Sequence, residues 1–217
     1  ETPDAYVAGM VEVFREVRRV LRDDGTLWLN LGDSYNNFRV SQCGQGLHQG
    51  EQRDKPPGRR AVDHALKEKD LCGIPWRVAF ALQADGWYLR SDIIWAKPNP
   101  MPESVTDRPT KAHEYLFLMT KSARYFYDAE AIMEPASDPN RGAQTSYGSA
   151  SPSHAGNQQD QHADRSREWG STGTRNRRSV WTVNTRPYPG AHFAVMPTDL
   201  VEPCIKAGSR IGDLVLD

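Results

Sequence analysis

The sequence predicts a protein of the α/β class, built as one domain with long polar insertions. An amphipathic helix is followed directly by a tight turn and a short apolar strand, an order typical of helices that cover a sheet. The 217 residues are enough for one domain with a sizeable core. Only 38% of them are hydrophobic, which indicates that polar segments interrupt this core.

The first two elements are a long helix and a short strand. Apolar residues recur at alternating steps of three and four at Val7, Met10, Phe14, Val17 and Leu21. This spacing predicts an amphipathic helix over residues 3–22, ended by Asp24-Gly25. Residues 26–31 (TLWLNL) are mostly apolar without strict alternation, and they are therefore expected to form a buried strand.

A polar insertion over residues 36–70 separates this strand from a second helix, expected at residues 74–84 and ended by Gly86. Two further strands are predicted at residues 87–96 and 113–120. The segment that joins them begins KPNPMP and contains too many prolines for a strand ladder.

The C-terminal part alternates between polar and apolar segments. Residues 125–127 are expected to add a short strand, and residues 129–178 form a second polar insertion with scarcely any aliphatic residue after Met133. A strand at 179–183, a helix at 197–207 kinked by Pro203, and a final strand at 213–217 complete the prediction.

Four blocks of the sequence carry a family resemblance, and they follow one another in a defined order. The blocks are residues 25–35 (GTLWLNLGDSY), 86–102 (GWYLRSDIIWAKPNPMP), 110–122 (TKAHEYLFLMTKS) and 191–209 (AHFAVMPTDLVEPCIKAGS). Together they resemble the beta class of amino-group DNA methyltransferases, in which catalytic blocks precede cofactor blocks. The resemblance implies a Rossmann-like methyltransferase fold, with residues 1–217 as a single, partial methyltransferase domain and residues 129–178 as a target-recognition or disordered insertion.

The same resemblance implies a site-specific enzyme of restriction–modification systems. Such enzymes transfer a methyl group from S-adenosylmethionine to the exocyclic amino group of cytosine (N4) or adenine (N6) in double-stranded DNA. The family's catalytic Pro-Pro motif is expected before Glu1 and its glycine-rich cofactor motif after Asp217. No residue of this chain is therefore assigned a catalytic role, and the chain is expected to be inactive alone. The DKPPG run at residues 54–58 is interpreted as a loop.

For the cofactor, the resemblance points to the last block and to two strand ends. The residues that match the family's tenth motif are His192, Phe193, Ala194, Pro197 and Leu200. Phe193 stands where the family usually has Pro, and Met196 where it usually has Phe. Asp217 would end the first cofactor strand, and Asp33 follows the strand at 26–31, because ligands of open α/β sheets bind at the carboxyl ends of strands. A simple turn role for Asp33 is an equal alternative.

For DNA, the resemblance points to the end of the strand at 87–96 and to two basic clusters. The first group is Trp95, Lys97, Pro98 and Asn99, beside the expected pocket of a flipped target base. Trp95 is interpreted either as a wall of that pocket or as a core residue, and Lys97 as a phosphate contact or a solvated side chain. The second group is Arg59, Arg60, Arg177 and Arg178, which are interpreted as DNA contacts or as parts of solubilising linkers.

The composition limits other functions. The net charge is -1, so attraction to DNA must come from local clusters. Three widely spaced cysteines give neither a metal motif nor a disulfide framework, and a reducing cytoplasm of a bacterial or phage host is expected, with no metal and no membrane partner. The alternatives to an enzyme are a DNA-binding module without catalysis and an inactive remnant of a methyltransferase.

Overall fold

The structure is a computed structural model, and it describes residues 2–36, 66–136, 173–187, 190 and 195–217. The chain divides into two compact units, the first formed by residues 1–127 and 179–217 and the second by residues 128–178. Each unit is described by itself. No helix within the described ranges is long and apolar enough to cross a membrane.

The first unit is built on a sheet of four strands in the order β1-β3-β2-β6. These are β1 (Thr26–Leu31), β2 (Tyr88–Ala96), β3 (His113–Thr120) and β6 (Val180–Thr182). Strand β3 is antiparallel to both β1 and β2, and β6 is parallel to β2. Strands β1, β2 and β6 therefore run in one direction, and their carboxyl ends share one edge of the sheet, called here the carboxyl edge.

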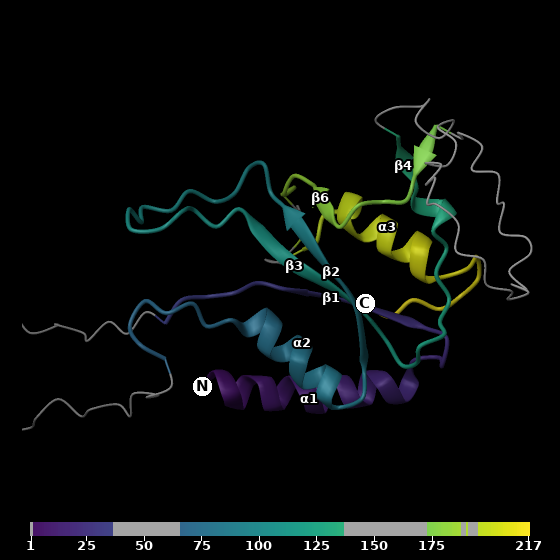
Figure 1. Cartoon of the computed structure of the whole chain (residues 1–217), viewed down its shortest axis with the longest axis horizontal. Helices are drawn as coiled ribbons and strands as arrows, with labels where there is room; N and C mark the ends of the chain where they lie inside the picture. The colour runs from purple at the N-terminus through teal and green to yellow at the C-terminus, as the bar shows by residue number, and fades with distance from the viewer. Residues whose placement is uncertain (1, 37–65, 137–172, 188–189, 191–194) are drawn as a thin grey trace, which may run out of the picture. The chain divides into compact units, whose positions relative to one another are not determined.

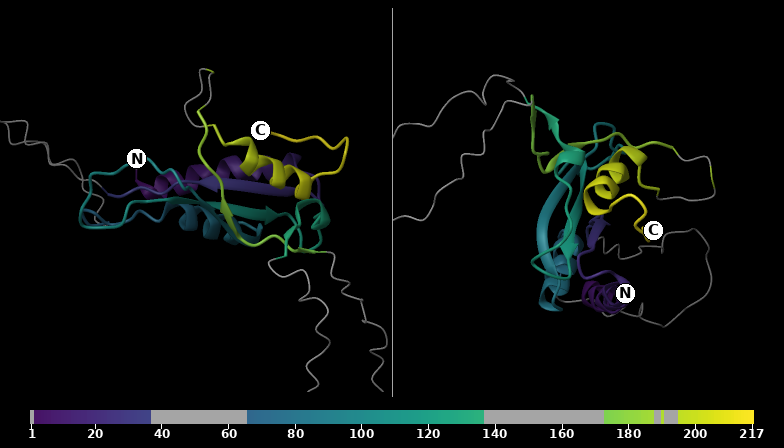
Figure 2. Two further views of the ribbon diagram at one scale, coloured as in Figure 1. Left: turned by 90° about the horizontal axis from the view of Figure 1, so that it is seen from above. Right: turned by 90° about the vertical axis from the view of Figure 1, so that its right-hand side faces the viewer.

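Within the described residues, three helices cover the two faces of this sheet. They are α1 (Pro3–Val20), α2 (Ile74–Ala84) and α3 (Thr198–Gly208). Figure 1 shows α1 and α2 on one side of the strands and α3 on the other, and Figure 2 gives two further views. The alternation of side chains along β3 explains the two cores, because Phe117 and Met119 face the first pair of helices while Leu116 packs with Leu200 of α3.

Local sequence explains where the helices begin and how closely one of them approaches the sheet. Thr2 caps α1 by accepting a hydrogen bond from the Ala5 amide at 3.1 Å, and Pro3 occupies the first turn. At the other end of the unit, α3 closes against the start of β1. A Cβ added to Gly208 would lie 2.3 Å from the hydroxyl oxygen of Thr26, so this contact requires glycine.

Most predicted elements are confirmed, including β1, α2 and β3 with their expected bounds. The buried character of β1 is wrong, because β1 is an outer strand of the described sheet and only Leu29 in it is buried. The strand expected at residues 125–127 is also wrong. That segment forms no strand ladder, and the Phe126 amide instead donates a hydrogen bond to the Asp24 carbonyl in the turn before β1.

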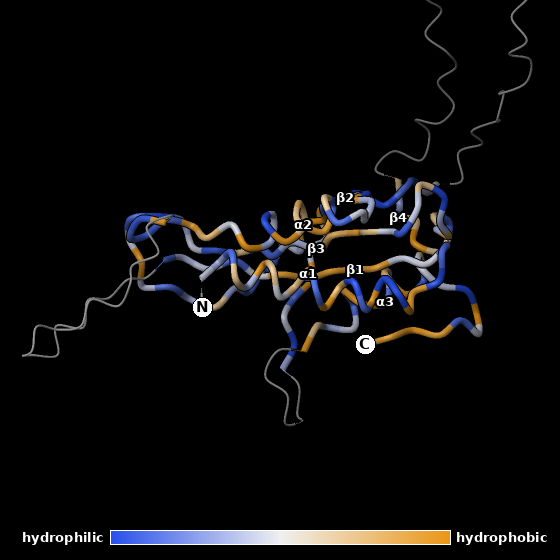
Figure 3. Tube along the Cα trace, turned by 90° about the horizontal axis from the view of Figure 1, so that it is seen from below, coloured by the Kyte–Doolittle hydropathy of each residue, from blue (hydrophilic) through white to orange (hydrophobic). Residues whose placement is uncertain are grey.

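The strand expected at residues 213–217 is absent as well. The three middle residues of this segment are hydrophobic, as Figure 3 shows near the C-terminus, yet Leu214 is fully exposed and the segment pairs with none of the described strands. An apolar pattern makes a strand only where a neighbouring strand accepts its backbone hydrogen bonds.

The described part of the second unit is small. A 3-10 turn (Glu130–Ile132) leads into β4 (Glu134–Pro135), which pairs antiparallel with β5 (Thr174–Arg175). The unit begins within one residue of the composition change that defines the predicted insertion at 129–178. Most of both polar insertions, residues 37–65 and 137–172, lies outside the described residues. The role of the second insertion in target recognition stays a prediction.

Candidate active site

The topology gathers several polar segments at the carboxyl edge of the first unit. Asp33 follows the end of β1, and Lys97 follows the end of β2. Glu114 lies at the start of the antiparallel strand β3, and Gly73 begins α2. Segments that are far apart in the sequence therefore meet here because parallel strands end at a common edge.

Asp33 caps the amino end of α2 from a distance. Its carboxylate accepts hydrogen bonds from the backbone amides of Gly73 at 3.1 Å and Ile74 at 3.0 Å, and also from the amide of Ser34 at 2.9 Å. Gly73 itself has a left-handed backbone (φ 70°) and no side chain that can cap the helix. The sequence offered a simple turn role as the alternative to cofactor contact, and the structure adds to this alternative a cap on α2. Contact of Asp33 with a cofactor stays a prediction.

Lys97 and Glu114 form a hydrogen-bonded ion pair across β2 and β3. Both side chains are largely buried, with relative exposures of 17% and 25%. The ammonium group of Lys97 also lies 4.2 Å from the ring centre of Trp95, a distance suited to a cation–π contact. Lys97 is therefore turned toward protein groups in this conformation and not toward solvent.

Trp95 belongs to the core between the sheet and α3. Its side chain is 4% exposed, and its indole nitrogen donates a hydrogen bond to the Val183 carbonyl at 2.8 Å. It packs in one cluster with Leu116 and Leu200. Of the two interpretations from the sequence, the structure places Trp95 in the core, where its ring supports Lys97.

Asn99 joins the segments that follow β2 and β6. Its side-chain amide donates to the Thr185 carbonyl at 3.3 Å and accepts from the Thr185 amide at 3.1 Å. The side chain thereby reproduces the paired hydrogen bonds of a strand ladder where Pro98 and Pro100 prevent the backbone from doing so. Pro98 and Asn99 are both exposed at this edge.

Lys111 is a residue of this site to which the sequence gave no role of its own. Its ammonium group donates to the Asp33 carbonyl oxygen at 2.9 Å and so joins β3 to the loop after β1. Desolvation lowers the pKa of Lys111 below its ordinary value, although the charges of Asp33 and Glu114 act in the opposite direction. The sequence signal that could have identified Lys111 as a site residue is its position in the block at residues 110–122, two residues before β3.

The residues expected at the cofactor are not brought together as one pocket. Pro197 is buried at the N-cap of α3 and Leu200 is fully buried in the α3 core, while Asp217 is exposed. His192, Phe193 and Ala194 lie outside the described residues. Among the described members, two are packed inward and Asp33 holds three backbone amides. Their contact with S-adenosylmethionine stays a prediction.

The basic residue pairs fall in different places. Arg59 and Arg60 lie outside the described residues, whereas Arg177 and Arg178 belong to the second unit. There Glu134 accepts hydrogen bonds from Arg178 at 2.6 Å and from Arg175 at 2.8 Å. Desolvation raises the pKa of Glu134, but the two hydrogen bonds and the positive charges of Arg178 and Arg175 together outweigh it and hold the pKa below its ordinary value.

The described residues contain no group of three His, Cys, Asp or Glu side chains arranged to hold a metal ion. Cys72 and Cys204 are buried free thiols. The carboxyl edge instead offers half-buried cations and carboxylates that hold backbone segments in place, together with the exposed loop after β2.

Comparison with known proteins agrees with this architecture. A family model described as DNA methylase matches residues 1–217. The chain is 48% identical over 98% of its length to the type II methyltransferase M.SmaI of Serratia marcescens, and 47% identical over 98% to M.Cfr9I of Citrobacter freundii. It is 46% identical over its full length to M.XycI of Xanthomonas campestris pv. cyanopsidis. The chain spans 61%, 59% and 60% of the lengths of these relatives. With a match over its whole length, the chain belongs to the DNA methylase family.

Proposed function

We propose that the protein containing this chain is a site-specific DNA methyltransferase. It transfers the methyl group of S-adenosylmethionine to the exocyclic amino group of cytosine (N4) or adenine (N6) in double-stranded DNA. The observation that carries the proposal is the family match over all 217 residues, with 46–48% identity to three type II methyltransferases. The mixed sheet with three parallel strand ends at one edge is compatible with it.

The chemistry explains what the carboxyl edge must do. The lone pair of an exocyclic amine is delocalised into the base, so the amine must be held by acceptors that direct this lone pair at the methyl donor. The cofactor supplies an electrophilic methyl group on sulfur. The residues described here have the supporting task, in which Asp33, Lys97, Lys111 and Glu114 fix the loops that surround the reacting groups.

The target base must leave the duplex to reach such a site, which costs a few kcal/mol of stacking and pairing. We propose that the segment after β2 faces the flipped nucleotide, with Pro98 and Asn99 exposed toward it. In this proposal Trp95 acts indirectly, because its buried ring supports Lys97. Lys97 contacts a DNA phosphate by exchanging its pair with Glu114 for that phosphate.

The basic clusters are proposed as sequence-independent DNA contacts. Arg178 has an exposed side chain (68%), and Arg177 adjoins it in the second unit. Arg59 and Arg60 are proposed to act in the same way. Replacing Arg177 and Arg178 with Ala is expected to weaken DNA binding and to reduce the logarithmic salt slope by about one for each phosphate that is no longer neutralised. Unchanged slopes would show that this pair does not bind phosphates.

The proposed activity is tested with the complete protein. It is incubated with methyl-labelled S-adenosylmethionine and DNA of diverse sequence, and the modified positions are mapped. Label on the exocyclic amine of one base within a recurring sequence is the expected result. DNA binding without label would favour the DNA-binding module, and neither binding nor label would favour the inactive remnant.

A further inference from the structure

We propose that Met101 is the side chain that inserts into the DNA duplex at the position vacated by the flipped target nucleotide. The inference rests on the function proposed above and adds to it a residue that positions the substrate. It combines three observations, namely the exposure of Met101, the rigid attachment of the segment that carries it, and the place of that segment at the carboxyl edge.

Met101 is one of the most exposed large apolar side chains of the described residues, at 85% of its full exposure. Met101 stands between Pro100 and Pro102, and it is a member of neither hydrophobic core. A methionine left in water gains none of the free energy that burial of its side chain would release. An isolated apolar side chain of this kind suits insertion between bases better than it suits packing against a broad protein surface.

Residues 97–112, called here the arm, connect β2 to β3 and extend away from the sheet (Figure 1). The arm is tied down at its base by the hydrogen bond from the Lys97 amide to the Ala112 carbonyl at 2.8 Å, and by both bonds between Asn99 and Thr185. Pro98, Pro100 and Pro102 fix three φ angles and favour extended backbone at the residues before them. The segment around Met101 is therefore stiff.

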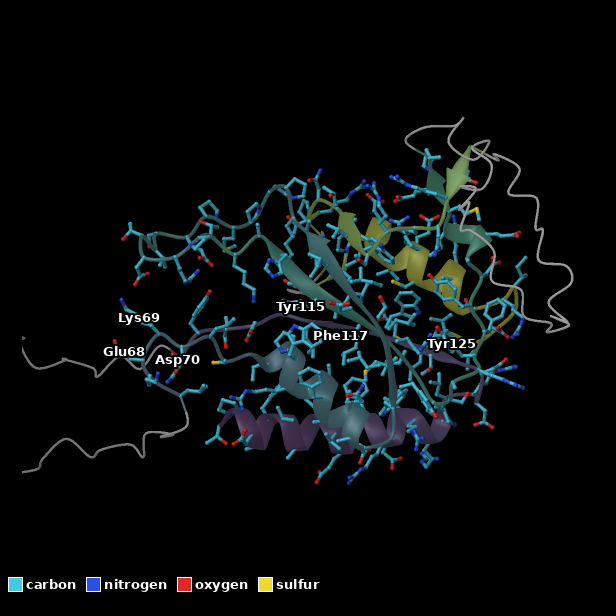
Figure 4. The ribbon with its side chains drawn as sticks, viewed as in Figure 1. Glu68, Lys69, Asp70, Tyr115, Phe117 and Tyr125 are labelled. Carbon is cyan, nitrogen blue, oxygen red and sulfur yellow. The ribbon has the colours of Figure 1, made fainter. Side chains whose placement is uncertain are left out.

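The returning half of the arm is held equally well. Arg108 pairs with Glu103 at 2.5 Å and lies 3.9 Å from the ring centre of Tyr35. Asp107 pairs with Lys69 at 2.7 Å, in the group Glu68, Lys69 and Asp70 that Figure 4 labels before α2. None of these contacts uses Met101. Its side chain is thus available to a partner while the arm stays attached.

The charges in the arm do not oppose its binding to DNA. Its two carboxylates, Glu103 and Asp107, are each paired with a cation, and the arm carries one more cationic residue than acidic ones. The arm follows the end of β2, at the edge where α/β sheets bind ligands. DNA-binding proteins unstack a base step by inserting an apolar side chain such as methionine, and the arm presents one on a stiff support.

The experiment compares the complete wild-type protein with Met101→Ala, Met101→Leu and the control Ile211→Ala, which removes another highly exposed apolar side chain outside the arm. The substrates are two duplexes built on the mapped site, one fully paired and one with a mismatched base opposite the target. Because the mismatch already weakens the pairing, it reduces the need for a wedge. The readouts are kcat/KM for methyl transfer and the fluorescence of 2-aminopurine placed at the target position.

We expect Met101→Ala to lower kcat/KM on the paired duplex by roughly 10- to 100-fold, matching part of the cost of unstacking. The deficit should shrink to less than about threefold on the mismatched duplex, since flipping is then easier. Met101→Leu and Ile211→Ala should retain nearly full activity and the full fluorescence increase. Equal deficits of Met101→Ala on both duplexes, or no deficit on either, would overturn the role of Met101. A wild-type protein that binds both duplexes but transfers no methyl group would refute the proposed function instead.

Discussion

The two edges of the sheet in the first unit use the same residue types for different purposes. At the carboxyl edge, Lys97 and Glu114 form a pair whose side chains are mostly buried. At the opposite edge, where β1 begins, Arg22 and Arg210 pair with Asp24, and their side chains are 67% and 49% exposed. Water screens the second group strongly and the first group much less.

This difference indicates where the protein depends on charge. Exposed ion pairs contribute little to stability, whereas half-buried charges must be matched, because a partner left alone keeps the full cost of its desolvation. The carboxyl edge also contains caps and clamps that join distant segments, such as Asp33 on α2 and Asn99 on Thr185. Substitutions there should have much larger effects than the same substitutions at the opposite edge.

The largest effect is expected for Trp95→Ala. Removing this buried ring takes away its packing in the α3 core and its hydrogen bond to Val183, at a cost of about 3–5 kcal/mol in the free energy of unfolding. Trp95→Phe should cost less, because only the hydrogen bond and part of the ring are removed. Denaturant unfolding of the complete protein measures both. A small decrease in stability with complete loss of methyl transfer would assign Trp95 to the target base instead.

The second-largest effect is expected for Glu114→Ala, because this substitution leaves the half-buried ammonium group of Lys97 without its carboxylate partner. We expect a decrease of about 1–3 kcal/mol in the free energy of unfolding. The double variant Glu114→Ala with Lys97→Met should recover part of this decrease, because no unmatched charge then remains. The coupling measured in this double-mutant cycle would be near zero if the pair behaved like those of the opposite edge.

Asp33→Ala is expected to destabilise the protein by about 1–2 kcal/mol, because the amides of Gly73 and Ile74 lose their acceptor at the start of α2. The control is Asp24→Ala at the opposite edge, which removes an aspartate that pairs with the exposed side chains of Arg22 and Arg210. Thermal unfolding should shift clearly for Asp33→Ala and much less for Asp24→Ala. Similar shifts in the two variants would remove the proposed distinction between the edges.

The smallest effect concerns the pH dependence contributed by Lys111. Desolvation lowers its pKa in the folded state, so unfolding takes up a proton between this lowered value and the ordinary value of lysine. The stability of the wild type relative to Lys111→Met should therefore rise with pH across that window and stay constant below it. Lys206→Met, at an exposed pair with Glu202, is the control for the removal of a lysine from the surface. If the difference in stability between the wild type and Lys111→Met did not change with pH, the ammonium group of Lys111 would be well solvated in the folded protein.

Much of the fold was accessible from the sequence because it depends on local patterns. Apolar residues spaced alternately three and four apart in residues 7–21 predicted α1, and apolar runs predicted β1 and β3 with their observed bounds. Four ordered sequence blocks also identified the family that the whole-chain match supports. These features needed no knowledge of which segments become neighbours.

The sequence also brought attention to Asp33, Trp95 and Lys97, but it left their roles open. Each role depends on partners that are distant along the chain, namely Gly73, Val183 and Glu114. Lys111 received no role for the same reason, since its partner is a backbone carbonyl 78 residues away. Hydrogen-bond partners and desolvation are properties of the packed sheet edge and have no local signature.

Tertiary structure decided that two shorter apolar segments did not become strands. Residues 213–217 have a strand-like pattern but no neighbour among the described strands, and in residues 125–127 the Phe126 amide bonds to the Asp24 carbonyl outside any strand ladder. The sequence by itself determined the helices, the main strands and the family, because hydrophobic periodicity and short motifs are encoded locally. The order of the strands decided the contacts of the site residues, because it fixes which backbone groups find hydrogen-bond partners and which charged side chains become buried.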